Sequence, residues 1–121
     1  MNARSLARHY AMLASGGQLD GVQILSPERI RLGSELQSYE WDEVYRVRIR
    51  RALGWRRGPD SGPGATDAAF GHVGGGGSFG YADPSRRFAI GFAKNYFTYA
   101  GGTPRRAGHA VADAVINALG I

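Results

Sequence analysis

The chain has 121 residues, a net charge of +5 at pH 7 and no cysteine. This length allows one domain at most. The lack of cysteine excludes disulfides and thiolate metal sites, and the three histidines, His9, His72 and His109, do not have the spacing of metal ligands. We therefore expect no metal and no cofactor. No apolar run approaches the roughly 20 residues of a membrane helix, and the N-terminus has no signal-peptide pattern, so we expect no membrane contact and a cytoplasmic location.

The first predicted element is a helix that starts at Asn2 and ends before Gly16. Asn2 is a good N-cap, and Leu6, Tyr10 and Leu13 recur at helical spacing and form an apolar stripe. Glycine at the end of this stripe is typical of a helix C-terminus. The stripe therefore predicts one face that packs on a core.

A second helix is predicted from Ser26-Pro27-Glu28, where serine caps, proline fits the first helical position and the carboxylate meets the positive helix end. Ile30 and Leu36 give this helix a weak core face. Between the two helices, Asp20-Gly21 indicates a turn followed by a short extended segment at 22–25.

The next part of the chain is predicted to hold one strand, at residues 44–55. Residues 37–42 show no regular pattern, and residues 58–64 consist mainly of turn-forming residues, so we expect a loop without core there. The strand region carries a cluster of arginines, which raises nucleic-acid binding as an alternative function. Several of them alternate with apolar residues, as on the solvent-exposed face of a strand, and no DNA- or RNA-binding signature accompanies them. We therefore expect no nucleic-acid partner. The cluster comprises Arg46, Arg48, Arg50, Arg51, Arg56 and Arg57.

The last third predicts a β-hairpin and a terminal helix. Residues 79–82 and 88–93 alternate around a connection at 83–86, so that bulky residues (Phe88, Ile90, Phe92) lie on one face of the return strand and small residues on the other. Apolar residues at three- and four-residue intervals predict a helix over 107–119, whose small side chains suit the small face of that strand. The predicted class is α+β, with helices covering an antiparallel sheet.

Four consecutive glycines, Gly74 to Gly77, precede this hairpin. Such a run indicates either a flexible turn or the close approach of another group to the backbone. Residues 75–80 fit the dinucleotide motif G-x-G-x-x-G, and residues 76–80 fit the nucleophile elbow G-x-S-x-G, with Asp83 and His109 following Ser78. Both motifs need a helix where this chain predicts a strand, so we reject both interpretations.

Five segments carry a family resemblance: 2–10, 16–21, 25–28, 53–55 and 71–84. In this order they resemble the C-terminal third of the serine β-lactamase-related family. This family contains penicillin-recognising hydrolases and esterases related to class C β-lactamases and D-alanyl-D-alanine carboxypeptidases. The resemblance implies a partial β-lactamase/transpeptidase-like fold, with residues 1–121 as the C-terminal portion of the domain.

In that family a Lys-Thr-Gly motif, often His-x-Gly in the esterase branch, lies on the strand that edges the pocket, and His72-Val73-Gly74 matches it. The resemblance implies that His72 faces the pocket and biases its electrostatics, and that the backbone N–H of Gly75 is one of two oxyanion donors. Val73, Gly74 and Gly76 would bind substrate. Valine in place of threonine removes a hydroxyl that would hold a substrate carboxylate, which favours esters over penicillin-like substrates.

The other two family motifs are absent from the sequence. No serine is followed by lysine three residues on, and none of the six tyrosines is followed by asparagine two residues on. We therefore expect the C-terminal segment of a serine hydrolase for a small-molecule ester or amide, which needs the N-terminal part of the same enzyme or a complementary chain for its nucleophile. The alternative is a non-catalytic binding module. In the related enzymes helices from both chain ends cover one sheet face, and we expect this chain to supply only the C-terminal helix. The bulky face at 88–92 should then stay exposed and cause self-association.

Overall fold

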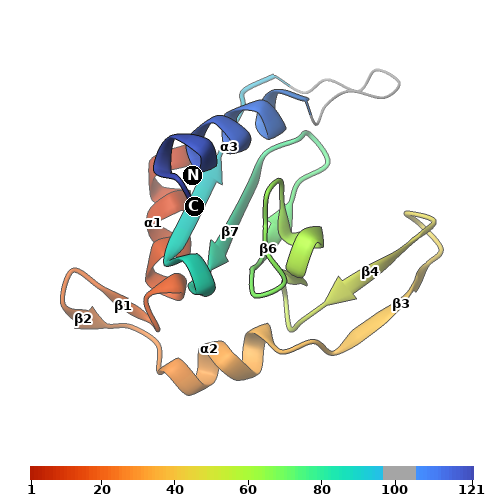
Figure 1. The fold of residues 1–121 in the computed structure, drawn as a ribbon. Coiled ribbons are helices and arrows are strands. Elements are labelled where there is room, and N and C mark those ends of the chain that lie inside the picture. The colour runs from red at the N-terminus through yellow and green to blue at the C-terminus, as the bar shows by residue number, and fades with distance from the viewer. Residues whose placement is uncertain (97–105) are drawn as a thin grey trace.

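The computed structural model describes residues 1–96 and 106–121 and has the predicted α+β class. Within this part of the chain, six strands form an antiparallel sheet in the sequential order β3-β4-β5-β6-β7-β8 (Figure 1). The elements are α1 (Ala3–Ala14), β1 (Gln18–Leu19), β2 (Val22–Gln23), α2 (Pro27–Ser34), β3 (Ser38–Asp42), β4 (Val47–Arg51), β5 (Arg56–Arg57), the 3₁₀ helix η1 (Gly58–Ser61), β6 (Phe70–Val73), β7 (Phe79–Asp83), η2 (Pro84–Arg86), β8 (Phe88–Phe92) and α3 (Arg106–Leu119).

The predicted caps and the predicted turn in the first third are confirmed. The Asn2 side chain accepts a hydrogen bond from the Ser5 amide at 2.9 Å, and the Ser26 hydroxyl accepts one from the Arg29 amide at 3.2 Å. Asp20 and Gly21 both have positive φ, 50° and 81°, as the tight turn between β1 and β2 requires. Local sequence chemistry therefore sets the boundaries of α1, α2 and the small hairpin.

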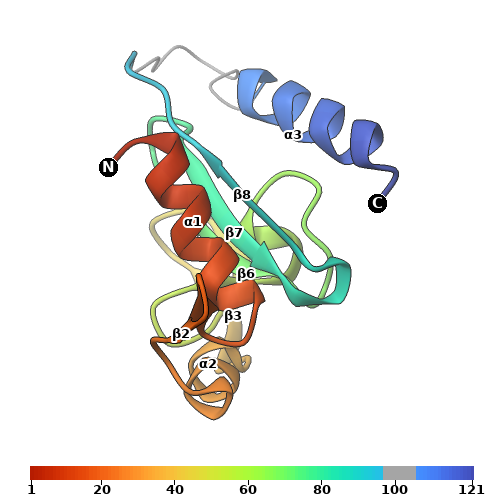
Figure 2. The ribbon, with the colours of Figure 1, turned by 90° about the vertical axis from the view of Figure 1, so that its left-hand side faces the viewer.

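Helix α1 lies on the face of β7 and β8 that carries small residues. A Cβ on Gly91 would lie 2.6 Å from the backbone nitrogen of Ala7, and one on Gly80 would lie 2.5 Å from Cε2 of Tyr10. The absence of side chains at these two positions lets the helix approach the strands closely. Figure 2 shows α1 and α3 on opposite sides of these strands.

Helix α3 packs on the bulky face, so the predicted pairing of this helix with the small face is wrong. Ala112 of α3 is buried in one cluster with Phe79, Tyr81, Phe88 and Ile90. Small residues on the helix pack against large rings on the sheet, so the helix lies close to the strands. The expectation that the bulky face stays exposed is also wrong, because Phe88 and Ile90 are only 7% and 8% exposed.

Two further expectations are corrected between α2 and β6. Residues 38–42, predicted to be irregular, form β3 and pair along their whole length with β4. The loop at 58–64 begins as η1 and does contribute to the core, since Ser61 and Pro63 are buried. The Ser61 hydroxyl donates to the carbonyl of Arg56 at 3.0 Å, and the Tyr81 hydroxyl donates to the carbonyl of Pro63 at 2.9 Å.

The β3–β4 hairpin projects away from α1 and α3 (Figure 1) and carries much of the exposed aromatic surface of the described residues. Tyr39, Trp41 and Tyr45 are 43%, 52% and 60% exposed. The guanidinium carbon atoms of Arg48 and Arg50 lie 5.9 and 4.6 Å from the ring centroid of Tyr39. The hairpin therefore exposes large aromatic side chains, whereas Phe88 and Ile90 on the bulky face of β8 are buried.

Asp83, at the end of β7, is fully buried and ties the loop before β6 to the sheet. One carboxylate oxygen accepts from the Ser85 hydroxyl at 2.6 Å and the other from the Thr66 amide at 3.3 Å. Burial raises the pKa of the Asp83 carboxyl, but these hydrogen bonds and the charge of Arg86 outweigh burial and lower this pKa below its ordinary value. The ionised carboxylate therefore stabilises the fold.

We expect Asp83→Asn to lower the free energy of unfolding near neutral pH by about 1–3 kcal/mol. Because the folded-state pKa lies below the unfolded value, this contribution is complete above about pH 4 and fades as the pH falls through the folded value, so the two proteins converge in acid. Urea titrations at neutral and acidic pH measure this, with the exposed Asp67→Asn as control. A loss that does not change with pH would contradict the role of the carboxylate charge.

We expect Gly91→Ala to lower the melting temperature by several degrees, because the new methyl group would meet backbone atoms of α1 that cannot move aside cheaply. Gly75→Ala is the matched control, since a Cβ at that glycine would meet nothing within 4 Å. Calorimetry on both variants makes the comparison. Equal melting temperatures would show that α1 does not dock as closely as described.

Candidate functional site

The glycine run forms the turn that joins β6 to β7. The Gly77 amide donates to the carbonyl of Gly74 at 3.0 Å, and the Gly74 amide donates to the carbonyl of Ser78 at 2.7 Å. Gly77 has φ of 93° and needs to be glycine, whereas Gly75 and Gly76 lie outside the left-handed region. This is the pattern of a type I turn followed by a glycine bulge. The turn therefore explains Gly77 but not the glycines at the two central positions.

One edge of β6 is open next to this turn. Strand β7 pairs with residues 70–73, but β5 pairs only with Phe70 and Gly71. The Gly74 amide points to β7, and backbone groups of successive strand residues point to alternate edges, so those of Val73 point to the open edge. The Gly75 amide donates no hydrogen bond within the described residues. Backbone donors and acceptors are thus available to a ligand along this edge.

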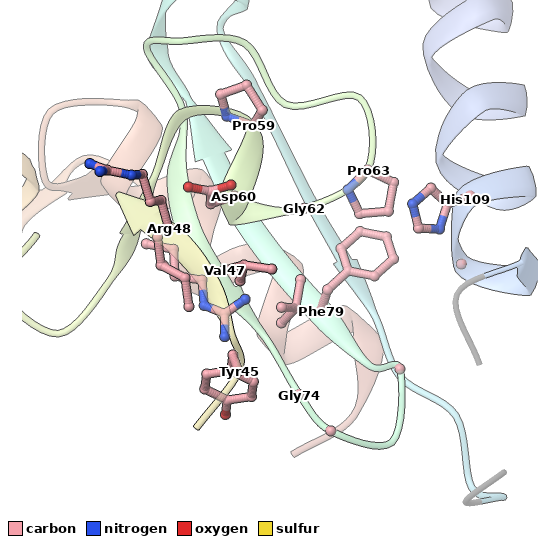
Figure 3. Close-up of a pocket in the computed structure, with 16 residues that line it drawn as sticks. Tyr45, Val47, Arg48, Pro59, Asp60, Gly62, Pro63, Gly74, Phe79 and His109 are labelled. Atoms are coloured by element: carbon pink, nitrogen blue, oxygen red, sulfur yellow. The ribbon is translucent and has the colours of Figure 1, made fainter. Parts of the chain in front are cut away.

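A cavity of about 670 Å³ lies beside the open edge and contains three of the five predicted site residues, Val73, Gly74 and Gly75 (Figure 3). Its other walls come from β4, η1 and the first turn of α3, and include Val47, Pro59, Pro63, Phe79 and His109. Within the described ranges, elements far apart in sequence therefore enclose the turn after β6. Gly76, the fourth predicted residue, is half-buried in the turn and lines neither this cavity nor the smaller one described next.

His72 is exposed and lies on the other side of β6. It lines a smaller cavity of about 250 Å³ together with Trp55 and Gly54. The register pairs His72 with Gly80, which faces α1, whereas Val73 pairs with Phe79, which faces α3. The structure therefore places the two predicted catalytic positions, His72 and Gly75, on different cavities that meet at the strand edge.

Arg56 and Tyr45 line both cavities and were not singled out as site residues from the sequence. The guanidinium carbon of Arg56 lies 5.2 Å from the Tyr45 ring centroid. Strand β5 has two residues, so no alternation marked Arg56 as a residue of the pocket wall. The available signal was its closeness to Leu53-Gly54-Trp55, one of the segments that carry the family resemblance.

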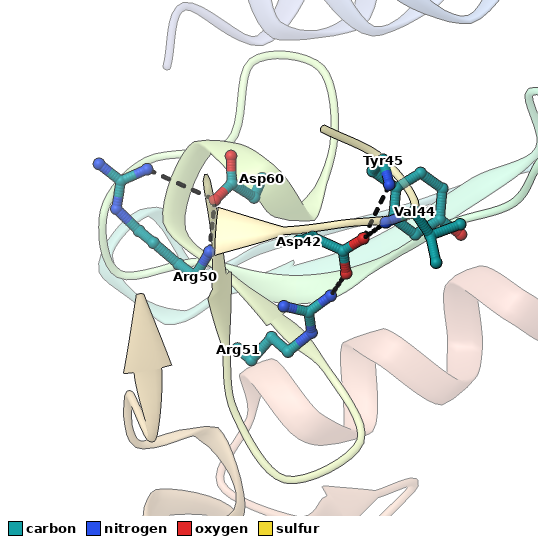
Figure 4. A network of polar contacts seen from close by, with 6 residues as sticks. All are labelled: Asp42, Val44, Tyr45, Arg50, Arg51 and Asp60. Atoms are coloured by element: carbon teal, nitrogen blue, oxygen red, sulfur yellow. Dashed lines mark hydrogen bonds and ion pairs between the residues drawn. The ribbon is translucent and has the colours of Figure 1, made fainter. Parts of the chain in front are cut away.

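The polar network in Figure 4 fixes the position of Tyr45. One oxygen of Asp42 accepts hydrogen bonds from the amides of Val44 and Tyr45 at 2.8 and 2.7 Å, and the other binds Arg51. The amide of Tyr45, assisted by Arg51 and the amide of Val44, lowers the pKa of the Asp42 carboxyl against the effect of burial. The hairpin turn that carries Tyr45 is therefore held by an ionised side chain.

Three of the six clustered arginines make polar contacts within the protein. Arg50 binds Asp60 and Arg51 binds Asp42, while Arg57 donates to the carbonyl of Ala68. These contacts fit the interpretation that the arginines lie on the solvent-exposed face of a strand. The absence of a nucleic-acid partner stays a prediction.

The nucleophile elbow is not assembled around Ser78. The residue is followed by β7 and not by a helix, and its hydroxyl accepts from the Lys94 amide at 3.2 Å. Asp83 lies at the far end of β7, about 17 Å along an extended strand, where it binds Thr66 and Ser85. The same strand excludes the dinucleotide interpretation, which also requires a helix after the glycines.

Neither a metal-ligand group nor a membrane span is found in the described parts of the chain. No three histidine, aspartate or glutamate side chains in residues 1–96 and 106–121 gather as a metal site. No helix in the same ranges has the length and apolar character to cross a membrane.

Comparisons with known proteins identify related chains. A family model described as Beta-lactamase matches residues 1–115. Esterase/beta-lactamase LipL of Mycobacterium tuberculosis is 36% identical over 94 residues, which cover 77% of this chain and 21% of LipL. Among solved structures, a family VIII carboxylesterase has a TM-score of 0.80 and 36% identity over 94% of this chain and 31% of its own.

Two more solved structures support the same fold. A penicillin-binding protein homologue from Caulobacter crescentus has a TM-score of 0.77 and 35% identity over 91% of this chain and 31% of its own. EstA from Arthrobacter nitroguajacolicus has a TM-score of 0.73 over 98% of this chain and 33% of its own, and at 24% identity it supports the fold alone. This chain therefore spans about a third of the solved relatives and about a fifth of LipL.

We expect the chain alone to hydrolyse no p-nitrophenyl ester above background and to form no adduct on Ser78 with a fluorophosphonate probe. The reason is that the Ser78 hydroxyl is bound to the Lys94 amide and that Asp83 is occupied elsewhere. Mass spectrometry of the labelled chain tests this, with Ser78→Ala and an active family VIII carboxylesterase as controls. An adduct that disappears in Ser78→Ala would restore the nucleophile-elbow interpretation.

Proposed function

Because the chain belongs to the beta-lactamase family, we propose that it forms the substrate-binding sheet of a serine esterase of this family. In this proposal the chain supplies one oxyanion donor, while the nucleophile comes from a part of the enzyme outside these residues. The relatives that support an esterase are LipL and the family VIII carboxylesterase, which share 36% identity with this chain. The absence of Ser-x-x-Lys and Tyr-x-Asn from the sequence agrees with this division.

The observation that carries the proposal is the open edge of β6 beside the larger cavity. A substrate carbonyl that approaches this edge meets the Gly75 amide, which has no hydrogen-bond acceptor in the described residues. A backbone N–H placed at the developing oxyanion contributes about 2.7–4 kcal/mol to transition-state stabilisation. A Cβ at Gly75 would meet no atom within 4 Å, so no other part of the described chain covers this position.

The other predicted residues take supporting roles in this proposal. The backbone of Val73 aligns the substrate along the strand edge, and the bare Cα atom of Gly74 allows close approach. Gly76 lines neither cavity and belongs to the turn that holds Gly75. His72 contributes a polar imidazole from the smaller cavity on the other side of the strand. The substrate class is a small-molecule ester or amide. Valine at position 73 favours esters, as its side chain offers no hydroxyl to a carboxylate.

The partner in this proposal is the nucleophile-bearing N-terminal part of the same enzyme or a complementary chain. A stable complex of the chain with such a part that binds ester analogues without hydrolysing them would instead support the non-catalytic binding module.

A hybrid enzyme tests the proposal: this chain replaces the matching third of a family VIII carboxylesterase. We expect p-nitrophenyl ester hydrolysis in the hybrid, and a fall in kcat of about 10²–10³-fold for Gly75→Pro, which removes the amide hydrogen. Proline suits the second position of a type I turn, so the turn should persist.

Gly75→Ala is the control for the hybrid, since it keeps the amide hydrogen and meets no atom within 4 Å. Its kcat should stay within a few-fold of the parent. Equal activities of Gly75→Pro and Gly75→Ala would exclude the Gly75 amide from the oxyanion hole.

A further inference from the structure

Tyr45 is an aromatic side chain at the border of the two cavities. It lines both the larger cavity beside the glycine turn and the smaller cavity beside His72. The same hairpin exposes two further rings, Tyr39 and Trp41, but these line neither cavity. In the view of Figure 3, Tyr45 lies at the same end of the larger cavity as Gly74. A ligand at the open edge of β6 therefore has one aromatic ring of the hairpin beside it.

The backbone that carries the Tyr45 ring is fixed by Asp42. The Tyr45 amide donates to one side-chain oxygen of Asp42 at 2.7 Å (Figure 4). The next amide, that of Arg46, donates to the Asp42 carbonyl at 2.7 Å, and the Asp42 carboxylate is itself bound to Arg51. The ring is therefore attached to a backbone that loses little conformational freedom when a ligand binds.

One face of the Tyr45 ring is covered by a cation and the rest of the ring is accessible. The guanidinium carbon of Arg56 lies over the ring, 5.2 Å from its centroid, which restrains the ring. Among the described residues no second aromatic ring packs on Tyr45, and the residue is 60% exposed. The face away from the guanidinium is thus available to a planar group of a ligand.

The wall next to this ring favours an apolar group. Val47, Ile49 and Phe79 line the larger cavity together with Tyr45. Their side chains carry no hydrogen-bond donor or acceptor, so this part of the wall gains most from contact with apolar surface. A group that is both planar and apolar, such as a phenyl ring, satisfies the wall and the exposed ring together.

We propose that Tyr45 is a specificity-determining residue that stacks on an aromatic ring of the substrate, so that this site prefers esters or amides with an aryl group beside the reacting carbonyl. The inference rests on the proposed function, because Gly75 marks where that carbonyl lies. Offset stacking of two rings stabilises a complex beyond the burial of apolar area. Tyr45 thereby distinguishes aryl from alkyl groups of equal size, which the aliphatic side chains of the wall cannot do.

Binding to the chain alone tests this inference, since binding needs no nucleophile. The probes are two pairs of neutral amides: N-phenylacetamide with N-cyclohexylacetamide, which carry the ring on the leaving-group side, and benzamide with cyclohexanecarboxamide, which carry it on the acyl side. We expect the aryl member of at least one pair to bind about three- to ten-fold more tightly, as measured by NMR titration of the Gly75 amide. The Tyr45 ring protons should shift upfield in that titration, because stacked rings shield each other. A cyclohexyl ring is at least as apolar as a phenyl ring, so burial of apolar area alone predicts no aryl preference.

Two tyrosines of the hairpin provide the matched comparison. Tyr45→Leu should abolish the aryl preference, whereas Tyr45→Phe, which retains the ring, should keep it. Tyr39→Leu should also keep it, since Tyr39 contacts the Arg50 guanidinium, 4.6 Å from its centroid, and lines neither cavity. Tyr45→Leu retains the amide that donates to Asp42, so the hairpin turn should persist. If this variant does not fold, the shift of the Tyr45 ring protons in the parent chain decides the question.

Equal affinities within both pairs would overturn the inference, as would equal losses in Tyr45→Leu and Tyr39→Leu. An aryl preference without a shift of the Tyr45 ring protons would also overturn it. The result is separable from the hybrid-enzyme test. Aryl preference without Gly75-dependent hydrolysis would count against the oxyanion role, and hydrolysis without aryl preference would count against Tyr45.

Discussion

The close contact between α1 and the strands β7 and β8 fixes the rest of the structure. Bare Cα atoms at Gly80 and Gly91 bring the helix backbone against the sheet, and Tyr10 then packs over Gly80. Burial raises the pKa of the Tyr10 hydroxyl, although a hydrogen bond from the backbone of His72 acts in the opposite direction. Tyr10 and Leu13 of the helix are buried in one cluster with Phe70 of β6, so the helix positions β6 as well as β7. Since β6 carries the open edge, the geometry of the candidate site depends on this contact.

On the opposite face of β7 and β8, large residues lie on the sheet and small residues on the helix. There the sheet supplies the rings and α3 supplies the small residues, so that Gly108 approaches Phe79 closely. Burial raises the pKa of Tyr81 to about 12, so its hydroxyl keeps its proton and donates to the carbonyl of Pro63. This hydrogen bond holds the loop after η1 against the sheet. Pro63 and Phe79 then form a wall of the larger cavity, so the packing of this face also shapes the site.

Sequence reasoning predicted elements whose signals are local and missed features that depend on distant contacts. Caps at Asn2 and Ser26 and the Asp20-Gly21 turn depend on neighbouring residues, and all three are confirmed. Alternation of large and small residues in β8 defined its two faces but not which helix covers each. The signal for β3 was present, since aromatic Tyr39 and Trp41 alternate with polar residues, yet the segment lies among irregular residues.

In the candidate site, too, sequence reasoning missed the features that depend on distant contacts. His72 and Gly75 were proposed through a family resemblance that covers nearly the whole chain, and not through periodicity. The resemblance could not predict that the two positions border different cavities. That depends on which face of β6 each residue occupies and on where the pairing of β5 with β6 ends. Arg56 escaped notice for a related reason. A two-residue strand has no pattern of its own, and the residue gains its place only when η1, the β3–β4 hairpin and β6 come together.

The arginine-rich composition acquires a specific meaning in this geometry. Pairing of Arg50 with Asp60 engages the acidic residue that lines the larger cavity, and within the described residues it leaves Arg48 and Arg56 on the cavity wall without an ion pair. Since the paired arginines also hold η1 and the hairpin turn, one set of ion pairs both builds the walls and sets their charge. Substitution of Arg50 would therefore free the Asp60 carboxylate on the wall of the larger cavity as well as loosen that wall. For this reason the charge of the site is a property of the whole hairpin and not of one residue.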